Sequence, residues 1–202
     1  MKNIIFNTLN SIQSYVLNNK QDDSIHYLSK FSKLMRMMLT SSRENEIAIA
    51  DEIKLLTYYI ELERLRFNTH FDYSFNIDEE IDQEFVEIPP MLLQPYIENA
   101  IIHGLQPRKE EGGMLVIHMT LEDDFINIKI EDNGIGRIAS QKKKRSSGIK
   151  HQSKGMLITK ERLELLNQDV EKAFSVRIID RVDDSGKASG TCVELLIRFD
   201  DD

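Results

Sequence analysis

Two polar side chains near the middle of the chain have the chemistry to hold a metal ion and a phosphate. Asn99 and His103 lie four residues apart in residues 89–105, PPMLLQPYIENAIIHGL, whose apolar spacing predicts a helix. Because a helix advances about 100° per residue, both side chains continue an apolar stripe that includes Leu92 and Tyr96. An amide on such a stripe is costly unless it is hydrogen-bonded or coordinates something, and its oxygen suits Mg²⁺. An Asn99 satisfied by neighbouring backbone is the simpler interpretation of this helix alone.

A carboxylate further along the chain is the second candidate. Residues 125–131 predict a strand whose isoleucines share one face, and a further step of two residues puts Asp132 on that face. An unpaired buried carboxylate is costly, so Asp132 needs either a fixed donor or a ligand that supplies one.

Small and hydroxyl residues could complete a purine site around Asp132. Gly134 and Gly136 follow it in NGIG, and glycines at this spacing permit positive φ and the close approach of a ligand, although DNG alone is typical of a turn. Thr191 follows Gly190 and has the parity of the apolar residues in the last predicted strand, so its hydroxyl is expected to face inward. Such a site can accept a hydrogen bond from the exocyclic amine of a purine, with phosphates extending toward the asparagine.

Cations that could meet those phosphates come from residues 137–154, a basic, serine-rich segment without period that is predicted to be a mobile functional loop. Lys154 is one of these cations. Gly155 immediately precedes a predicted helix whose N-terminus favours an anion. A solvated run of charge is the alternative for residues 142–145. For His103, a half-exposed histidine near a helix end is nearly as good an interpretation as a phosphate contact.

Three amphipathic helices are predicted in the first third of the chain. Apolar residues recur at helical spacing over residues 4–18, and the pattern returns from Leu28 to Met38. Residues 51–67 are apolar over two adjacent faces, so that helix needs more than one neighbour, either the following domain or a second copy of the chain. We expect a homodimer through these helices.

The period then changes, and the rest of the chain mixes strands with helices, which indicates an α+β fold. The second and third strands should form an antiparallel hairpin across the acidic turn at residues 122–124. The predicted strands are residues 71–77, 115–121, 125–131, 174–181 and 193–199, with a helix over residues 156–167.

Composition excludes several classes of protein. The 202 residues, 41% of them apolar, suffice for one sizeable domain or two small ones. A net charge of −8 argues against a nucleic-acid-binding role, and a single cysteine, Cys192, rules out an intramolecular disulfide and fits a reducing compartment. No apolar run approaches the ~20 residues of a membrane span, and the N-terminus lacks the core of a secretion signal. We expect a soluble chain without direct membrane contact.

Four stretches together resemble, in order and spacing, the N, G1, G2 and G3 boxes of the Bergerat (GHKL) ATP-binding fold. They are ENAIIHG around Asn99, DNGIG from Asp132, the loop ending SKG at Gly155, and SGT at Gly190. Upstream, FNTLNSIQ, YLSKFSKLMR and YIELERLRF resemble the LytS-type sensor histidine kinases, so the resemblance covers essentially the whole chain.

The resemblance implies a helical dimerisation segment over residues 1–67 and, over residues 68–202, an ATP-binding domain that is a two-layer α/β sandwich with helices on one face of a mixed sheet. It also implies ATP and Mg²⁺ as cofactors and a response regulator as partner. By the same resemblance, Asn99 binds Mg²⁺, Asp132 binds the adenine amine, Thr191 supports the adenine, and Gly134, Gly136 and Gly155 line the nucleotide.

One departure from the family concerns the phosphoryl acceptor. The family's acceptor helix begins with a Pro-His-Phe run that ends in Phe-Asn; Phe6 and Asn7 keep this ending, but Asn3 stands at the histidine position and Lys2 at the proline. An amide cannot accept a phosphoryl group as imidazole does, so self-phosphorylation at the family's site is expected to be absent. Either a degenerate receptor or a cut or altered first segment explains this. The remaining histidines are expected to be structural or exposed: His26, His70, His118 and His151.

Three functions remain open on the sequence. The main hypothesis is the cytoplasmic core of a histidine kinase that moves a γ-phosphoryl group to an imidazole, cut from a parent protein anchored in the membrane. The second is an ATP-sensing dimer without transfer. The third is an ATP-hydrolysing clamp, which needs a base to activate water; Glu98 precedes Asn99 but points about 100° away around the helix.

Overall fold

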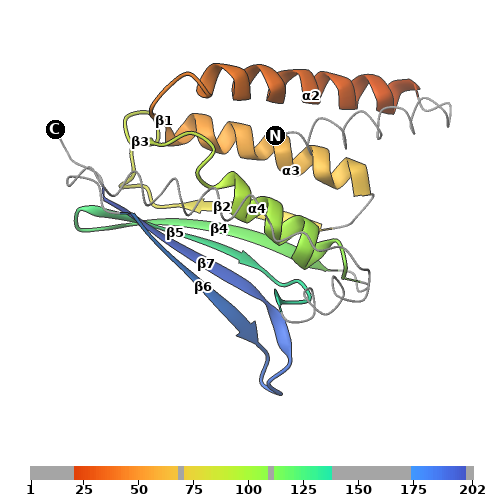
Figure 1. Cartoon of the computed structure of the whole chain (residues 1–202), viewed down its shortest axis with the longest axis vertical. Helices are drawn as coiled ribbons and strands as arrows, with labels where there is room; N and C mark the ends of the chain where they lie inside the picture. Colours follow the sequence, from red (N-terminus) through yellow and green to blue (C-terminus); the bar gives the residue numbers. More distant parts are fainter. Residues whose placement is uncertain (1–20, 68–70, 109–111, 138–173, 199–202) are drawn as a thin grey trace.

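The computed structural model describes residues 21–67, 71–108, 112–137 and 174–198 (Figure 1). The predicted helices over residues 4–18 and 156–167 lie outside these residues, as does most of the basic segment. So do Asn3, Lys154 and Gly155. Among the residues described, no helix is both long enough and apolar enough to cross a bilayer.

A five-stranded mixed sheet forms one layer, in the order β2-β4-β5-β7-β6. Its strands are β2 (Phe71–Ile77), β4 (Gly113–Glu122), β5 (Phe125–Asp132), β6 (Phe174–Val182) and β7 (Ala188–Arg198). β2 pairs with β4 in parallel, and the other neighbours are antiparallel, including the predicted β4–β5 hairpin. β7 begins at Ala188 rather than at the predicted residue 193, because its pairing with β5 and β6 continues past Thr191. Gly190 and Thr191 therefore lie inside a strand.

The described helices lie on one face of this sheet, as the α+β resemblance implies (Figure 1). They are α2 (Gln21–Ser41), α3 (Ile49–Phe67), α4 (Gln94–Asn99) and η1 (Ala100–Leu105), which continues α4. A small antiparallel pair, β1 (Ile47–Ala48) and β3 (Glu87–Ile88), joins the start of α3 to the segment before α4. The core between the two layers includes Ile126, Ile128 and Ile130 of β5, each at most 1% exposed.

The helix of the ENAIIHG stretch begins later and ends differently than predicted. A helix that tolerates Pro95 in its first turn is predicted to start near Met91. This start is wrong, because Met91 has a φ of +57° and the helix begins only at Gln94. Pro95 is accommodated in the first turn, where a missing N–H costs nothing. The last part, η1, is a π-helical turn, closed by the bond from the Gln106 N–H to the Ile101 carbonyl at 2.8 Å. A uniform 100° stripe therefore does not extend to His103.

α3 lies between α2 and α4 (Figure 1), so both of its apolar faces are covered within the chain. The apolar repeat predicted for α2 is divided between two faces of the helix. Met38 is buried and Phe31 packs against the core together with Tyr27 and Leu34, whereas Leu28 is 48% exposed. Since α2 contacts α3 along a single stripe, periodicity alone could not tell which of two adjacent apolar stripes is the covered one.

Candidate functional site

Asp132 ends β5 and faces the helix layer, as its parity predicts. The side chain is 3% exposed, and its Oδ1 accepts a hydrogen bond of 2.8 Å from the Gly134 N–H. Thr191 is the directly paired residue on β7, and it also hydrogen-bonds to the carboxylate. The predicted inward orientation of both side chains is confirmed.

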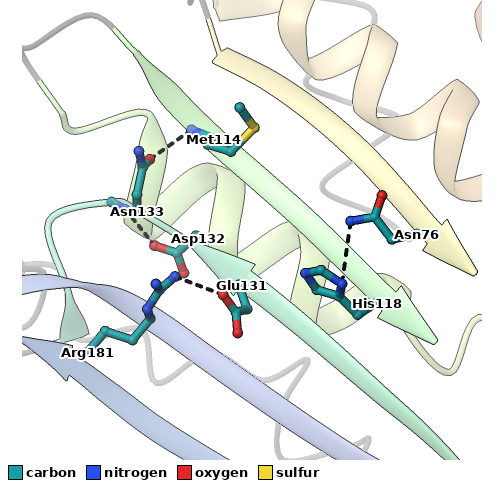
Figure 2. A network of polar contacts seen from close by, with 8 residues as sticks. Asn76, Met114, His118, Glu131, Asp132, Asn133 and Arg181 are labelled. Carbon is teal, nitrogen blue, oxygen red and sulfur yellow. Dashed lines mark hydrogen bonds and ion pairs between the residues drawn. The ribbon is translucent and has the colours of Figure 1, made fainter. Parts of the chain in front are cut away.

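Burial raises the pKa of Asp132 from its ordinary value of 3.8 to about 6, against the opposing effects of the Gly134 N–H, the Arg181 charge and Thr191. Arg181 forms its ion pair with Glu131, at 3.0 Å between Nη1 and Oε2 (Figure 2). The Arg181 charge also lowers the pKa of Asp132. Asp132 is therefore a buried carboxylate that is ionised at neutral pH and is held mainly by N–H and O–H donors.

Three glycines allow backbone to pack closely around this carboxylate. A Cβ on Gly134 would lie 2.2 Å from the carbonyl carbon of Gly104, and a Cβ on Gly104 would lie 2.6 Å from Asp132 Oδ1. Gly190 has a φ of +127°, and its Cβ would lie 1.8 Å from the Asp132 carbonyl oxygen. The Ile135 N–H donates to the Gly104 carbonyl at 3.0 Å. η1, the loop after β5 and β7 thus meet at Asp132.

Gly134 faces the backbone of Gly104 rather than an open space for a ligand. The space in front of Gly134 is filled by the backbone of Gly104, so its missing side chain serves helix–loop packing. Gly136, with a φ of +75°, approaches the Ala188 side chain at the start of β7 in the same way. Sequence reasoning missed Gly104; a glycine inside an otherwise apolar helix, where it costs about 1 kcal/mol, was the signal that could have found it.

The loop after Asp132 is held by its asparagine. Asn133 Oδ1 accepts from the Met114 N–H at 2.7 Å, and its Nδ2 donates to the Gly112 carbonyl at 2.9 Å (Figure 2). Arg108, just after η1, donates from Nη1 to the Asn133 carbonyl at 2.7 Å. These two residues, which the sequence did not single out, give the loop a defined conformation next to the carboxylate.

Asn99, the last residue of α4, is half-buried. Its Nδ2 donates to the Pro95 carbonyl at 2.6 Å, so the simpler interpretation, a backbone-satisfied amide, holds for the nitrogen. The bond turns the nitrogen toward the helix and leaves the hard oxygen as the atom suited to a cation. Gly104 lies five residues further along the continuous helix of α4 and η1. Half-buried His103 lies between them in η1.

The other histidines and the cysteine behave as expected where they are described. His118 lies in β4 beside Asn76, at 3.4 Å between the amide nitrogen and the ring (Figure 2). His26 is exposed on α2. Cys192 is a buried strand residue, and burial raises the pKa of its thiol to about 11.

The chain is similar in sequence to known histidine kinases. The histidine kinase family model matches residues 3–71. Sensor protein LytS of Oceanobacillus iheyensis is 33% identical over 132 residues, which is 65% of this chain and 22% of that protein. Sensor histidine kinase YpdA of Escherichia coli K12 is 32% identical over 132 residues, again 65% of this chain and 22% of that protein. The chain thus spans less than a quarter of the length of these relatives.

Solved structures agree on the fold. The mycobacterial sensor histidine kinase MprB superposes with a TM-score of 0.51 at 12% identity, covering 76% of this chain and 95% of that one. At that identity the likeness concerns the fold alone. The sequence matches show that the chain is similar to LytS-type sensor histidine kinases.

Proposed function

We propose that this chain is the kinase core of a two-component sensor and binds Mg–ATP between η1, the loop after β5 and the start of β7. The observation that carries the proposal is Asp132, a buried carboxylate held by donors and bordered by three glycines. Such a group is costly to keep in an apoprotein, and a ligand that donates a hydrogen bond to it offsets part of that cost.

Each proposed contact follows from the chemistry of one side chain. Asp132 accepts the exocyclic amine of adenine, and Thr191 supports the base from β7. The backbone at Gly134 and Gly136 lines the nucleotide. Gly155 and Lys154, which lie outside the described residues, are assigned to the phosphate end on the resemblance alone.

The metal end of the proposed site fits Mg²⁺. Asn99 offers a neutral oxygen whose companion nitrogen is engaged by Pro95, and Mg²⁺ typically takes one or two protein oxygens together with phosphates and water. When bound, the ion would neutralise charge on the phosphates. His103, one turn further on, is proposed to donate to a phosphate.

Phosphoryl transfer is proposed to go to a histidine and from there to a response regulator. The acceptor is not residue 3 of this chain, because Asn3 has no nucleophilic nitrogen. An ATP-sensing dimer without transfer is the second candidate, and the same asparagine favours it. The matched residues span 22% of the length of LytS of Oceanobacillus iheyensis, so the proposed cytoplasmic location and the proposed membrane anchor concern the parent protein.

A homodimer through α2 is supported by an exposed apolar stripe on that helix. Ile25, Leu28 and Leu39 are 68%, 48% and 58% exposed, and with Met35 they follow one another at steps of three, seven and four residues. This is the spacing of a seam between two helices. The proposed boundary between the dimerisation segment, residues 1–67, and the ATP-binding domain, residues 68–202, places α3 on the dimerisation side.

The proposal is tested by titrating the chain with a non-hydrolysable ATP analogue and Mg²⁺ in a calorimeter. Saturable one-site binding supports it, and an absence of heat at millimolar analogue contradicts it. A second experiment separates the two candidates. Incubation with γ-labelled ATP should yield acid-labile phosphohistidine if the chain is a kinase. Binding of ATP without any transfer favours the ATP-sensing dimer.

A further inference from the structure

A single peptide group connects Arg108 to the buried carboxylate of Asp132. Its N–H belongs to Gly134 and donates to Asp132 Oδ1 at 2.8 Å. Its carbonyl belongs to Asn133 and accepts from Arg108 Nη1 at 2.7 Å. A peptide group is planar, and no cis peptide bond occurs among the described residues, so the carbonyl and the N–H point in opposite directions and turn together. A donor that fixes the carbonyl therefore also fixes the direction of the N–H.

Arg108 is itself held by the end of η1. Its backbone N–H donates to the carbonyl of Leu105, the last residue of η1, at 3.0 Å, and its side chain is half-buried. The same helical turn also bonds to the loop beyond the peptide group, because the Gly104 carbonyl accepts the Ile135 N–H at 3.0 Å. The peptide group before Gly134 thus lies between two hydrogen bonds to η1 and the residues after it, which restrict both its position and its tilt.

The Asn133 side chain holds the loop from the side of the sheet. The residue pairs of β4 and β5 end at Asp132, and the Asn133 N–H adds one more bond, to the Met114 carbonyl at 3.2 Å. The side-chain amide then bonds to the Met114 N–H and the Gly112 carbonyl, at 2.7 and 2.9 Å (Figure 2). Since a side-chain amide has the donor and the acceptor of a peptide group, it continues the β4–β5 pairing after the backbone has turned away.

We infer that Arg108 is a positioning residue for Asp132, acting through the peptide group between Asn133 and Gly134. The hydrogen bond to Oδ1 limits rotation of the carboxylate and so decides where its remaining acceptor sites point. A charged donor on the carbonyl also polarises the peptide group, which strengthens the bond that its N–H makes. The inference rests on the proposed function, since the preference of the site for the exocyclic amine of adenine then depends on Arg108.

The first test needs no nucleotide. In an NMR spectrum of the ligand-free, ¹⁵N-labelled chain, the amide proton of Gly134 reports its hydrogen bond, because a bond to a carboxylate moves that proton downfield. Arg108→Met removes the guanidinium donors and keeps most of the apolar part of the side chain. We expect the Gly134 proton to move upfield and to exchange with solvent about tenfold faster. Arg108→Lys, which keeps a charged donor, should restore part of both effects, and it carries the same test if Arg108→Met does not fold.

The second test compares two nucleotides in the presence of Mg²⁺. A non-hydrolysable inosine triphosphate analogue has an oxygen where the ATP analogue has its exocyclic amine, so it cannot donate to Asp132. The unaltered chain should prefer the ATP analogue, and Arg108→Met should reduce that preference to about threefold or less. Its affinity for the inosine analogue should stay within about twofold of the unaltered chain. Asn133→Ala removes the support from β4 and should reduce the preference in the same direction.

Each variant has a matched control elsewhere in the chain. Arg64→Met removes an arginine of α3 that is 38% exposed and pairs with Asp72 at 3.6 Å. Asn127→Ala removes an amide of β5 that donates to Glu122 at 2.9 Å, beside the β4–β5 turn and at the opposite end of the strand from Asp132. Both controls should leave the Gly134 amide proton and the preference for the ATP analogue unchanged.

Two results would overturn the inference. An unchanged Gly134 amide proton in Arg108→Met would mean that the peptide group keeps its direction without the arginine. An equal loss of affinity for both analogues would mean that Arg108 serves the stability of the loop alone. If the unaltered chain binds neither analogue, the proposed function fails instead, and the Gly134 proton of the ligand-free chain still decides whether Arg108 positions Asp132.

Discussion

Asp132 and Asn99, proposed to hold opposite ends of one nucleotide, are positioned by different kinds of contact. Around Asp132, three backbone segments meet at glycines, and the carboxylate is held by N–H and O–H groups within β5, β7 and the loop between them. Asn99 lies in a short helix, and the segment just before it is held by the buried carboxylate of Glu52 on α3. The part of the site proposed for the base is therefore held by backbone packing, whereas the part proposed for the metal depends on a charged side chain.

The largest expected effect comes from filling the glycine contact at the base end. Gly134→Ala places a methyl 2.2 Å from the Gly104 backbone, which no side-chain rotation can relieve. We expect the free energy of unfolding to fall by about 3 kcal/mol, with loss of nucleotide binding. Urea denaturation and calorimetry measure the two effects.

Gly186→Ala is the control for that variant. Gly186 also needs a special conformation, with a φ of +77°, but nothing lies within 4 Å of its Cβ position. Its cost should be only the backbone strain, about 1 kcal/mol, and nucleotide affinity should not change. Equal destabilisation by the two variants would argue against tight packing of the loop on η1.

Asp132→Asn should separate stability from binding. Because burial raises the pKa of Asp132 to about 6, the ionised carboxylate lowers the stability of the ligand-free fold as pH rises through that value. The amide keeps an oxygen for the Gly134 N–H. At pH 8 we expect a gain of about 1 to 3 kcal/mol in the free energy of unfolding and an affinity for the ATP analogue about 100-fold weaker.

The pH dependence of the free energy of unfolding shows whether the buried carboxylate stabilises or destabilises the ligand-free fold. The difference in stability between Asp132→Asn and the unaltered chain should be small near pH 4 and should grow toward pH 7. A difference that shrinks over this range would mean that the carboxylate is stabilised, not strained, in the ligand-free protein.

Glu63→Gln probes the metal end in the same way. The pKa of Glu63 rises from 4.5 to about 7, so its neutral form is favoured in the fold and the stability it contributes is lost between these values as pH rises. The groups that face it are Tyr59 and Arg66 on α3 and Glu98 on α4. Compared with the unaltered chain, the variant should become relatively more stable by about 1 to 3 kcal/mol between pH 4.5 and 7. Thermal unfolding across that range is the measurement, and a constant difference would contradict it.

Asn99→Ala should have the smallest effect on stability. It removes one exchangeable hydrogen bond to the Pro95 carbonyl, worth about 1 kcal/mol. Binding of the ATP analogue without Mg²⁺ should be unchanged, and the gain on adding Mg²⁺ should disappear. Retention of that gain would remove Asn99 as the metal ligand.

The base end was largely predictable because it follows from short-range periodicity. The alternation of apolar and polar residues along β5 and β7 predicted that Asp132 and Thr191 face inward. The acidic turn between two alternating runs predicted the β4–β5 hairpin. The boundary of α4 was not predictable in this way. Its start depends on Met91 at positive φ and on Glu52, about forty residues earlier in the chain, which binds the N–H groups there.

Other features of the metal end also depend on tertiary contacts. The π-helical turn η1 brings Gly104 against Asp132 and the loop after it, a contact between segments that periodicity treats separately. Which apolar residues of α2 are covered also depends on a tertiary contact, the position of α3.

The most direct test of Asp132 as the acceptor for adenine compares two bases on one site. Inosine triphosphate carries an oxygen where ATP carries the exocyclic amine, so it cannot donate to the buried carboxylate. With Mg²⁺ at pH 8, the unaltered chain should bind the ATP analogue at least about tenfold more tightly than the inosine analogue, and Asp132→Asn should lose this preference. Equal affinity of the unaltered chain for both nucleotides would contradict the role assigned to Asp132.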